Sequence, residues 1–144
     1  MGIAALPITL VTAGGAALIA LWLAIRTGRA RRAAGVSIGD GGDERLRARM
    51  RAQANYVESA PFILILIGLI ETTEGPSLWL WAASVVFLLA RVAHPFGMDG
   101  IRYCRTVGAT VTMVLLLGLG LYAVLTPLTA PATRPATIVG PSQG

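Results

Sequence analysis

The sequence contains no lysine, one cysteine and one histidine, and only 13% of its 144 residues are charged. The single cysteine, Cys104, excludes an intrachain disulfide, and with the single histidine, His94, it excludes a metal site built from several such residues. A soluble domain carries about 25% charged residues, so this chain lacks the side chains for a polar shell. Because 55% of its residues are hydrophobic, we expect lipid to solvate much of its surface.

Three apolar segments approach the length of about 20 residues that a transmembrane helix requires, and a fourth is about half as long. Residues 3–25 and 107–125 contain no charged residue, and a third segment runs from Pro76 to His94. The remaining segment is strongly apolar only from Pro61 to Ile70, so a full span must reach back through Asn55 and Glu58. The pattern predicts an all-α fold, a bundle of four transmembrane helices that run up and down.

The domain organisation follows from these segments. Residues 1–126 are predicted to form one transmembrane domain, and residues 127–144 a proline-rich, flexible tail. The first apolar run lacks a basic segment and a small-residue cleavage site before it, so it is predicted to be a retained helix. Asp43 is predicted to cap the second helix and Pro61 to kink or loosen it. The predicted connections are residues 28–42, 72–75 and 94–100.

Arginines indicate the orientation. Eleven of the twelve arginines flank the first and third connections, and only Arg134 lies on the opposite side. The positive-inside rule therefore places the arginine-rich ends in the cytoplasm and both termini in the periplasm. Arginine without lysine is typical of a GC-rich bacterial genome, so we expect a bacterial inner membrane. The net charge of +5 reflects this topology and contacts to lipid headgroups, and it does not require a nucleic-acid partner.

One face of the second helix collects polar residues. At about 100° per residue, four of them fall within about 80° of one another, while Arg45 and Arg49 point the other way. The four residues are Arg47, Arg51, Asn55 and Glu58. An ionisable group such as Glu58 inside a span costs several kcal/mol on insertion scales and usually faces a bundle interior or a cavity.

Three of these residues also have a structural interpretation. Glu58 could form an ion pair with Arg91 between helices. Arg47 could contact headgroups, and Asn55 could form an interhelical hydrogen bond.

More cations gather at the same predicted depth. Arg91 and His94 share a face at the end of the third helix, and Arg102 and Arg105 share one at the start of the fourth. His94 could instead be a cap or an interhelical hydrogen bonder. Several cationic donors near the carboxylate of Glu58 predict a pocket for a small anion that also has an amino group.

Three motifs resemble one family. Arg51-Ala52-Gln53-Ala54-Asn55-Tyr56-Val57-Glu58, followed by Pro61-Phe62, resembles the signature of the MAPEG family, the membrane-associated proteins in eicosanoid and glutathione metabolism. Arg91-Val92-Ala93-His94 and Arg105-Thr106 resemble the motifs of its third and fourth helices. The resemblance covers residues 43–125 and has its motifs in the family's order.

The resemblance implies a homotrimer that binds glutathione between subunits on the cytoplasmic side, as a cosubstrate and without a metal. It implies that Arg105 is the catalytic residue, because a guanidinium favours the nucleophilic thiolate. Glu58 suits the α-amino group of the tripeptide. The complete set of expected glutathione-binding residues is Arg47, Arg51, Asn55, Glu58, Arg91, His94 and Arg102.

The expected function is glutathione transfer to lipophilic electrophiles, or peroxidase action on them. Two departures from the family pattern favour an alternative, a non-catalytic member that binds a lipid or another small anion. Ala109 stands where some members have a tyrosine, and Ala54 stands where several have an arginine. A channel or transporter is disfavoured, because the first and fourth spans lack charged residues that could continue a path.

Overall fold

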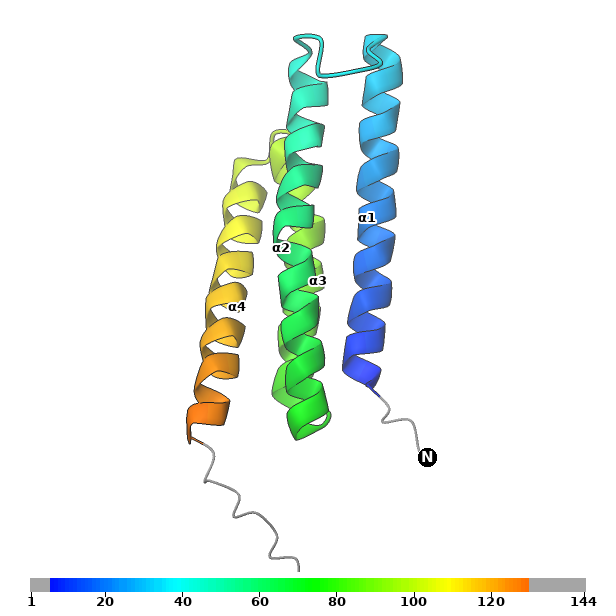
Figure 1. Cartoon of the computed structure of the whole chain (residues 1–144). Coiled ribbons are helices and arrows are strands. Elements are labelled where there is room, and N and C mark those ends of the chain that lie inside the picture. The colour runs from blue at the N-terminus through cyan, green and yellow to red at the C-terminus, as the bar shows by residue number, and fades with distance from the viewer. Residues whose placement is uncertain (1–5, 130–144) are drawn as a thin grey trace, which may run out of the picture.

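The computed structural model describes residues 6–129, which form four helices: α1 (Pro7–Ala34), α2 (Glu44–Glu74), α3 (Leu78–Met98) and α4 (Arg102–Thr129). The helices run alternately up and down, so the start of α1 and the end of α4 lie at the same end of the bundle (Figure 1). Each of the two central helices, α2 and α3, contacts all the others, whereas α1 and α4 do not meet within residues 6–129. The predicted all-α bundle is confirmed.

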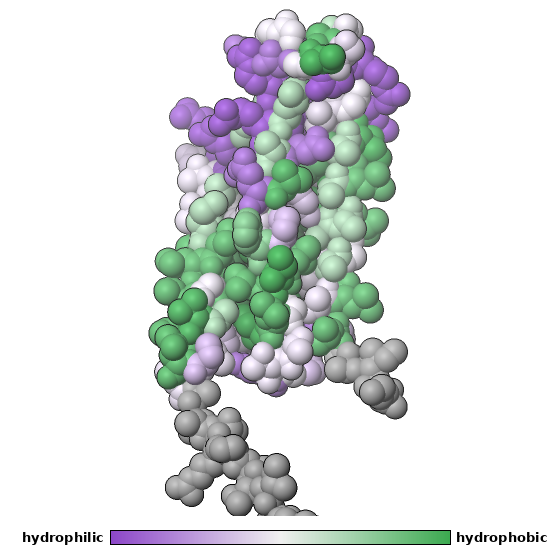
Figure 2. Space-filling view, viewed as in Figure 1, coloured by the Kyte–Doolittle hydropathy of each residue, from purple (hydrophilic) through white to green (hydrophobic). Residues whose placement is uncertain are grey.

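The surface of the bundle is that of a membrane protein. All four helices are long and apolar enough to cross a membrane. Large apolar side chains face outward on every helix, and Leu18, Leu69, Leu89 and Leu117 are each more than half exposed. Hydrophilic residues gather at the end that carries the α1–α2 connection (Figure 2). Lipid is the solvent that such an exterior requires, so the chain is a multi-pass membrane protein.

Two helices at the arginine-rich end are longer than predicted. α1 continues to Ala34, where Gly35 ends it with a φ of 65°, so the loop predicted from residue 28 is wrong. α3 continues through Pro95 to Met98, which replaces the turn predicted for residues 94–100. The physical reason is that each added helical turn satisfies backbone groups near the membrane, which outweighs the weak helix propensity of a single glycine such as Gly28.

The second helix is continuous from Glu44 to Glu74, with Pro61 inside it. The predicted cap is confirmed, because the backbone N–H of Leu46 donates to Oδ1 of Asp43 at 2.6 Å. The connection to α3 begins only at Gly75, whose φ is 80°, so the turn predicted from residue 72 starts too early.

α4 extends through Pro127 to Thr129, beyond the predicted end at residue 126. The rest of the predicted tail, residues 130–144, lies outside the described residues.

A carboxylate of α2 caps the start of α1. Pro7 has no N–H, and Leu6 makes no side-chain cap. The N–H groups of Ile8 and Thr9 donate to the two carboxylate oxygens of Glu71 at 2.9 and 2.7 Å. Glu71 is only 1% exposed, so its charge needs partners within the protein. The N–H groups that a helix start leaves free provide them. This contact joins α1 to α2 at the end opposite the arginines.

Glycines bring α3 and α4 into close contact. A Cβ atom on Gly97 would lie 2.0 Å from the backbone nitrogen of Arg105. A Cβ atom on Gly108 would lie 2.7 Å from the carbonyl oxygen of Ala90 and 2.9 Å from the Cβ of His94. Small residues allow such backbone approach between membrane helices. The two glycines therefore set the positions of Arg105 and His94.

Candidate functional site

A cavity of about 360 Å³ opens between α2, α3 and α4 at the arginine-rich end. The residues that line it come from all three helices: Arg51, Asn55, His94, Met98, Arg105, Thr106, Ala109 and Thr110. The structure thus brings together Arg51, Asn55, His94 and Arg105 from the set predicted for glutathione.

The lining of this cavity suits an anion. Arg51 and Asn55 lie one turn apart on α2, and Arg105 and Thr106 begin the wall that α4 supplies. Two guanidinium groups, an amide and hydroxyls line it, and no carboxylate does among the described residues. Guanidinium groups bind carboxylates through paired, charge-assisted hydrogen bonds. The cavity therefore offers donors to a negatively charged ligand.

His94 is buried and forms part of the cavity wall. Its Nδ1 lies 3.3 Å from the carbonyl oxygen of Arg105. A carbonyl can only accept, so this contact assigns a proton to Nδ1. His94 thereby forms the interhelical bond that the sequence left as an alternative, and its contact ties α3 to the backbone of the predicted catalytic arginine.

Arg91 lies behind the cavity wall and does not line it. Its side chain is 1% exposed, and its terminal nitrogens donate to Oδ1 of Asn55 at 3.0 Å and to Oγ1 of Thr112 at 3.2 Å. The guanidinium lies 5.5 Å from the ring centre of Tyr56, and its Nε has no hydrogen-bond partner among the described residues. Arg91 is thus a buried cation held by neutral groups, and it fixes the amide of Asn55.

The partners of Arg91 are themselves anchored. The Thr112 hydroxyl donates to the carbonyl oxygen of Gly108 at 2.8 Å. The Tyr56 hydroxyl donates to the carbonyl oxygen of Ala16 on α1 at 2.6 Å. Through these bonds Arg91 is held between α2 and α4, and the orientation of Asn55 depends on all four helices.

Glu58 lies apart from the cavity. It is exposed, and its side chain makes no hydrogen bond or ion pair with any residue from 6 to 129. The ion pair with Arg91 that the sequence suggested is therefore not formed within the chain, because Arg91 donates to Asn55 instead.

Two other predicted residues also lie elsewhere. Nε of Arg47 is 2.6 Å from Oδ2 of Asp40 in the α1–α2 connection, and this hydrogen bond lowers the pKa of the Asp40 carboxyl. Arg102 is exposed and lines a separate hollow with Tyr103 and Thr106.

Two cavity residues were not identified from the sequence. Met98 follows His94 by four residues on α3, and Thr110 follows Thr106 by four on α4. Residues four apart share a helix face, so this spacing could have identified both. The opposite orientation of Arg45 and Arg49 on α2 was correctly predicted, because both line a different cavity with α1.

The family model described as the MAPEG family matches residues 9–125. The chain belongs to the MAPEG family. The match begins in the first turns of α1 and ends near the end of α4, so it spans all four helices. No curated protein and no solved structure matches the chain. This multi-pass membrane protein therefore belongs to a family whose members take part in glutathione and eicosanoid metabolism.

The MAPEG motifs and the cavity coincide. Arg51 and Asn55 come from the second-helix motif, His94 from the third and Arg105 with Thr106 from the fourth, and all of them line the same cavity. The motif residues Glu58 and Arg91 do not line it. Within the chain, the family motifs therefore contain residues that face the cavity, one residue that supports its wall and one that faces outward.

Proposed function

We propose that the protein is a glutathione-dependent membrane enzyme that acts on lipophilic electrophiles. The observation that supports it is the placement of Arg51, Asn55 and Arg105 in one cavity of a MAPEG bundle. Glutathione carries two carboxylates, an ammonium and a thiol, so it needs several cationic donors and one acceptor. The cavity offers the donors.

The chemistry assigns a role to each group. Arg51 binds a glutathione carboxylate, and Asn55 donates through its amide nitrogen because Arg91 occupies its oxygen. Arg105 stabilises the thiolate electrostatically. In transfer, the thiolate sulfur forms a bond to the electrophilic carbon, and the leaving group departs with its bonding pair. In peroxidase action, two glutathione molecules are oxidised to the disulfide, and a lipid hydroperoxide is reduced to the alcohol and water.

The proposal includes a homotrimer. Glu58 is exposed within a span and has no cation partner in the described part of its own subunit. A carboxylate facing lipid is costly, so a subunit boundary is the favourable place for it. A neighbouring subunit would close the cavity, and Glu58 at that boundary would accept from the amino group of glutathione. The arginine-rich end faces the bacterial cytoplasm, with both termini in the periplasm.

Binding is tested by the melting temperature of the detergent-purified protein. Millimolar glutathione raises it and millimolar glycine does not, because glycine lacks the second carboxylate and the thiol. Arg51→Ala abolishes the shift, whereas Arg32→Ala on the same end of the bundle, outside the cavity, keeps it. A shift that is equal for glutathione and glycine, or unchanged in Arg51→Ala, would contradict glutathione binding in this cavity.

One observation favours a second function, that of a non-catalytic binding protein. Ala109 lines the cavity, one turn after Arg105, so a methyl group stands where some MAPEG members have a tyrosine hydroxyl. A chlorodinitrobenzene conjugation assay separates the two functions. Conjugation that depends on Arg105 supports the enzyme, and a glutathione-induced thermal shift without conjugation supports the binding protein.

A further inference from the structure

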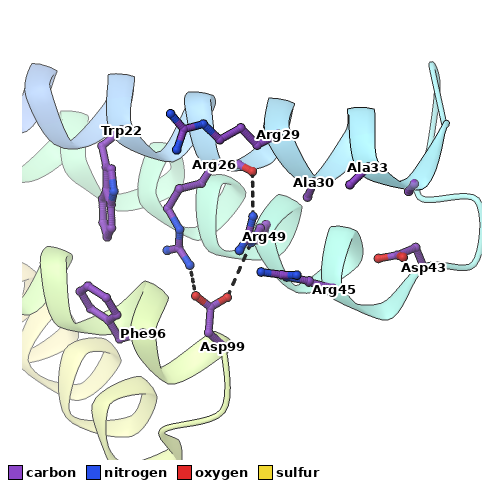
Figure 3. Close-up of a pocket in the computed structure, with 11 residues that line it drawn as sticks. Trp22, Arg26, Arg29, Ala30, Ala33, Asp43, Arg45, Arg49, Phe96 and Asp99 are labelled. Carbon is purple, nitrogen blue, oxygen red and sulfur yellow. Dashed lines mark hydrogen bonds and ion pairs between the residues drawn. The ribbon is translucent and has the colours of Figure 1, made fainter.

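A larger cavity, of about 680 Å³, lies on the other side of α2 at the same end of the bundle. It is lined by α1, α2 and the end of α3, and it is open to the outside (Figure 3). It shares no residue with the cavity between α2, α3 and α4. Four arginines line it, namely Arg26, Arg29, Arg45 and Arg49, together with Asp43 and Asp99. We name it the α1–α3 cavity.

The α1–α3 cavity already binds one carboxylate of its own chain. Asp99 at the end of α3 forms an ion pair with Arg26 of α1, and it lies 3.8 Å from Nε of Arg49 on α2. Figure 3 shows Arg26 and Arg49 approaching Asp99 from two helices. The Arg26 guanidinium also lies 4.9 Å from the ring centre of Trp22, which limits its movement. The cavity is therefore built around an oxyanion held by guanidinium groups.

Asp99 does not satisfy the donors of this cavity. Nε of Arg49 is buried and has no hydrogen-bond partner among the described residues, because 3.8 Å to Asp99 is too long. Arg29 and Arg45 are exposed, and their side chains make no hydrogen bond or ion pair with any residue from 6 to 129. The Asp43 carboxylate accepts from the start of its own helix. With four arginines and two aspartates, the cavity has two positive charges in excess, and one buried donor lacks a partner within residues 6–129.

The position of the cavity indicates the source of an anion. Trp22 and Phe96 form one wall, with ring centres 5.6 Å apart. Tryptophan is enriched at the boundary between headgroups and acyl chains, which places Trp22 near that boundary. Towards the membrane centre, Leu18 and Leu21 of α1 are 70% and 58% exposed. A phosphate in the cavity would thus have apolar surface beside it for acyl chains, and basic pockets between membrane helices bind anionic lipid headgroups.

We propose that the α1–α3 cavity binds the phosphate of an anionic phospholipid, with Arg45 and Arg29 as the unpaired donors. Arg45 and Arg49 are neighbours four residues apart on α2 and line the same wall. Paired guanidinium nitrogens match phosphate oxygens in geometry and charge. The acyl chains lie against α1 below Trp22. This site lies within one subunit and is independent of glutathione binding between α2, α3 and α4.

The test counts lipids retained by the delipidated full-length protein in native mass spectrometry after titration with phosphatidylglycerol or phosphatidylcholine. Wild type retains one phosphatidylglycerol per subunit and no phosphatidylcholine. Arg45→Gln weakens the binding of phosphatidylglycerol about tenfold, the effect of one lost charged hydrogen bond. Arg32→Gln, an equal charge change on an exposed α1 residue outside the cavity, changes it less than about twofold.

The other outcomes are equally informative. Equal retention of phosphatidylcholine would contradict the selectivity for an anionic lipid. An equal loss of phosphatidylglycerol in Arg45→Gln and Arg32→Gln would show a general attraction to positive charge in place of a site. Displacement of the lipid by millimolar inorganic phosphate would show that the cavity binds a free anion, and it would overturn the proposal of a lipid ligand. Both variants keep the wild-type melting temperature, since neither side chain is bonded, and both keep the glutathione-induced shift.

Discussion

Replacement of Arg91 by methionine separates the binding of glutathione from the stability of the bundle. In the structure Arg91 is 1% exposed, bonded to Asn55 and Thr112, and without a carboxylate partner among the described residues. Methionine removes these two hydrogen bonds, but it also removes a buried cation whose desolvation is not offset by a counter-charge. The two terms oppose each other, so we expect the melting temperature to change by only a few degrees.

Glutathione binding should weaken in the same variant, because Asn55 loses the bond that orients its amide. Asn55 is half-buried, so water replaces part of the lost bond and the effect lies near the lower end for a hydrogen bond, about 1 kcal/mol. That energy corresponds to about fivefold in the dissociation constant. Isothermal titration of detergent-purified protein with glutathione measures it.

A double-mutant cycle tests whether Arg91 acts through Asn55. If it does, Arg91→Met adds no loss of affinity on top of Asn55→Ala, and the coupling energy equals the whole effect of Arg91→Met. If Arg91 instead contacts glutathione directly, as the sequence predicted, the two losses add. Additive losses, or full affinity in Arg91→Met, would refute the positioning role.

Five further changes test the site and the topology. Arg105→Ala should slow conjugation about tenfold at pH 7, because a neighbouring cation favours the thiolate. The pH dependence of the rate should move upward, towards the free thiol pKa of about 8.5. A pH profile identical to that of wild type would exclude this role of Arg105. Arg105→Lys should recover part of the rate. Gly97→Ala should lower the rate and the melting temperature together, because its Cβ would meet the backbone of Arg105 at 2.0 Å; an unchanged rate would show that this contact does not set the site. Glu58→Gln should weaken glutathione binding about 10- to 150-fold without loss of melting temperature, whereas lower stability with unchanged affinity would assign Glu58 a structural role. A reporter fused after Gly144 should be active in the periplasm, and activity in the cytoplasm would reverse the proposed orientation.

The architecture was predictable because a membrane helix has a strong signature in composition and length. The arginine distribution indicated which ends would lie together, and the structure places the hydrophilic residues at one end (Figure 2). Helix ends were less predictable, because Gly28 and Pro95 are breakers in water but lie inside helices here. Their local propensities are weaker than the need to satisfy backbone groups near lipid.

The candidate site was predictable in part. Helical spacing and motif order correctly gathered Arg51, Asn55 and Arg105. Spacing could not show that Arg91 turns inward to Asn55, because that orientation depends on Thr112 and Tyr56 from two helices. Nor could it show that Asp99 attracts Arg26 across the bundle, since the partners are 73 positions apart in the sequence. Such pairings depend on the packing of helices, which a single sequence does not encode locally.

The cap that Glu71 provides for α1 has a consequence for how the chain enters the membrane. α1 precedes α2 in the chain, so in sequential insertion α1 enters the bilayer before Glu71 of α2 does. Until then the N–H groups of Ile8 and Thr9 have no carboxylate partner, and unsatisfied groups of this kind are costly in hydrocarbon. A nascent α1 should therefore keep its first turn in the headgroup region and settle into its final depth only when α2 arrives. The first two helices would then mature as a hairpin, with α2 completing the membrane insertion of the helix before it.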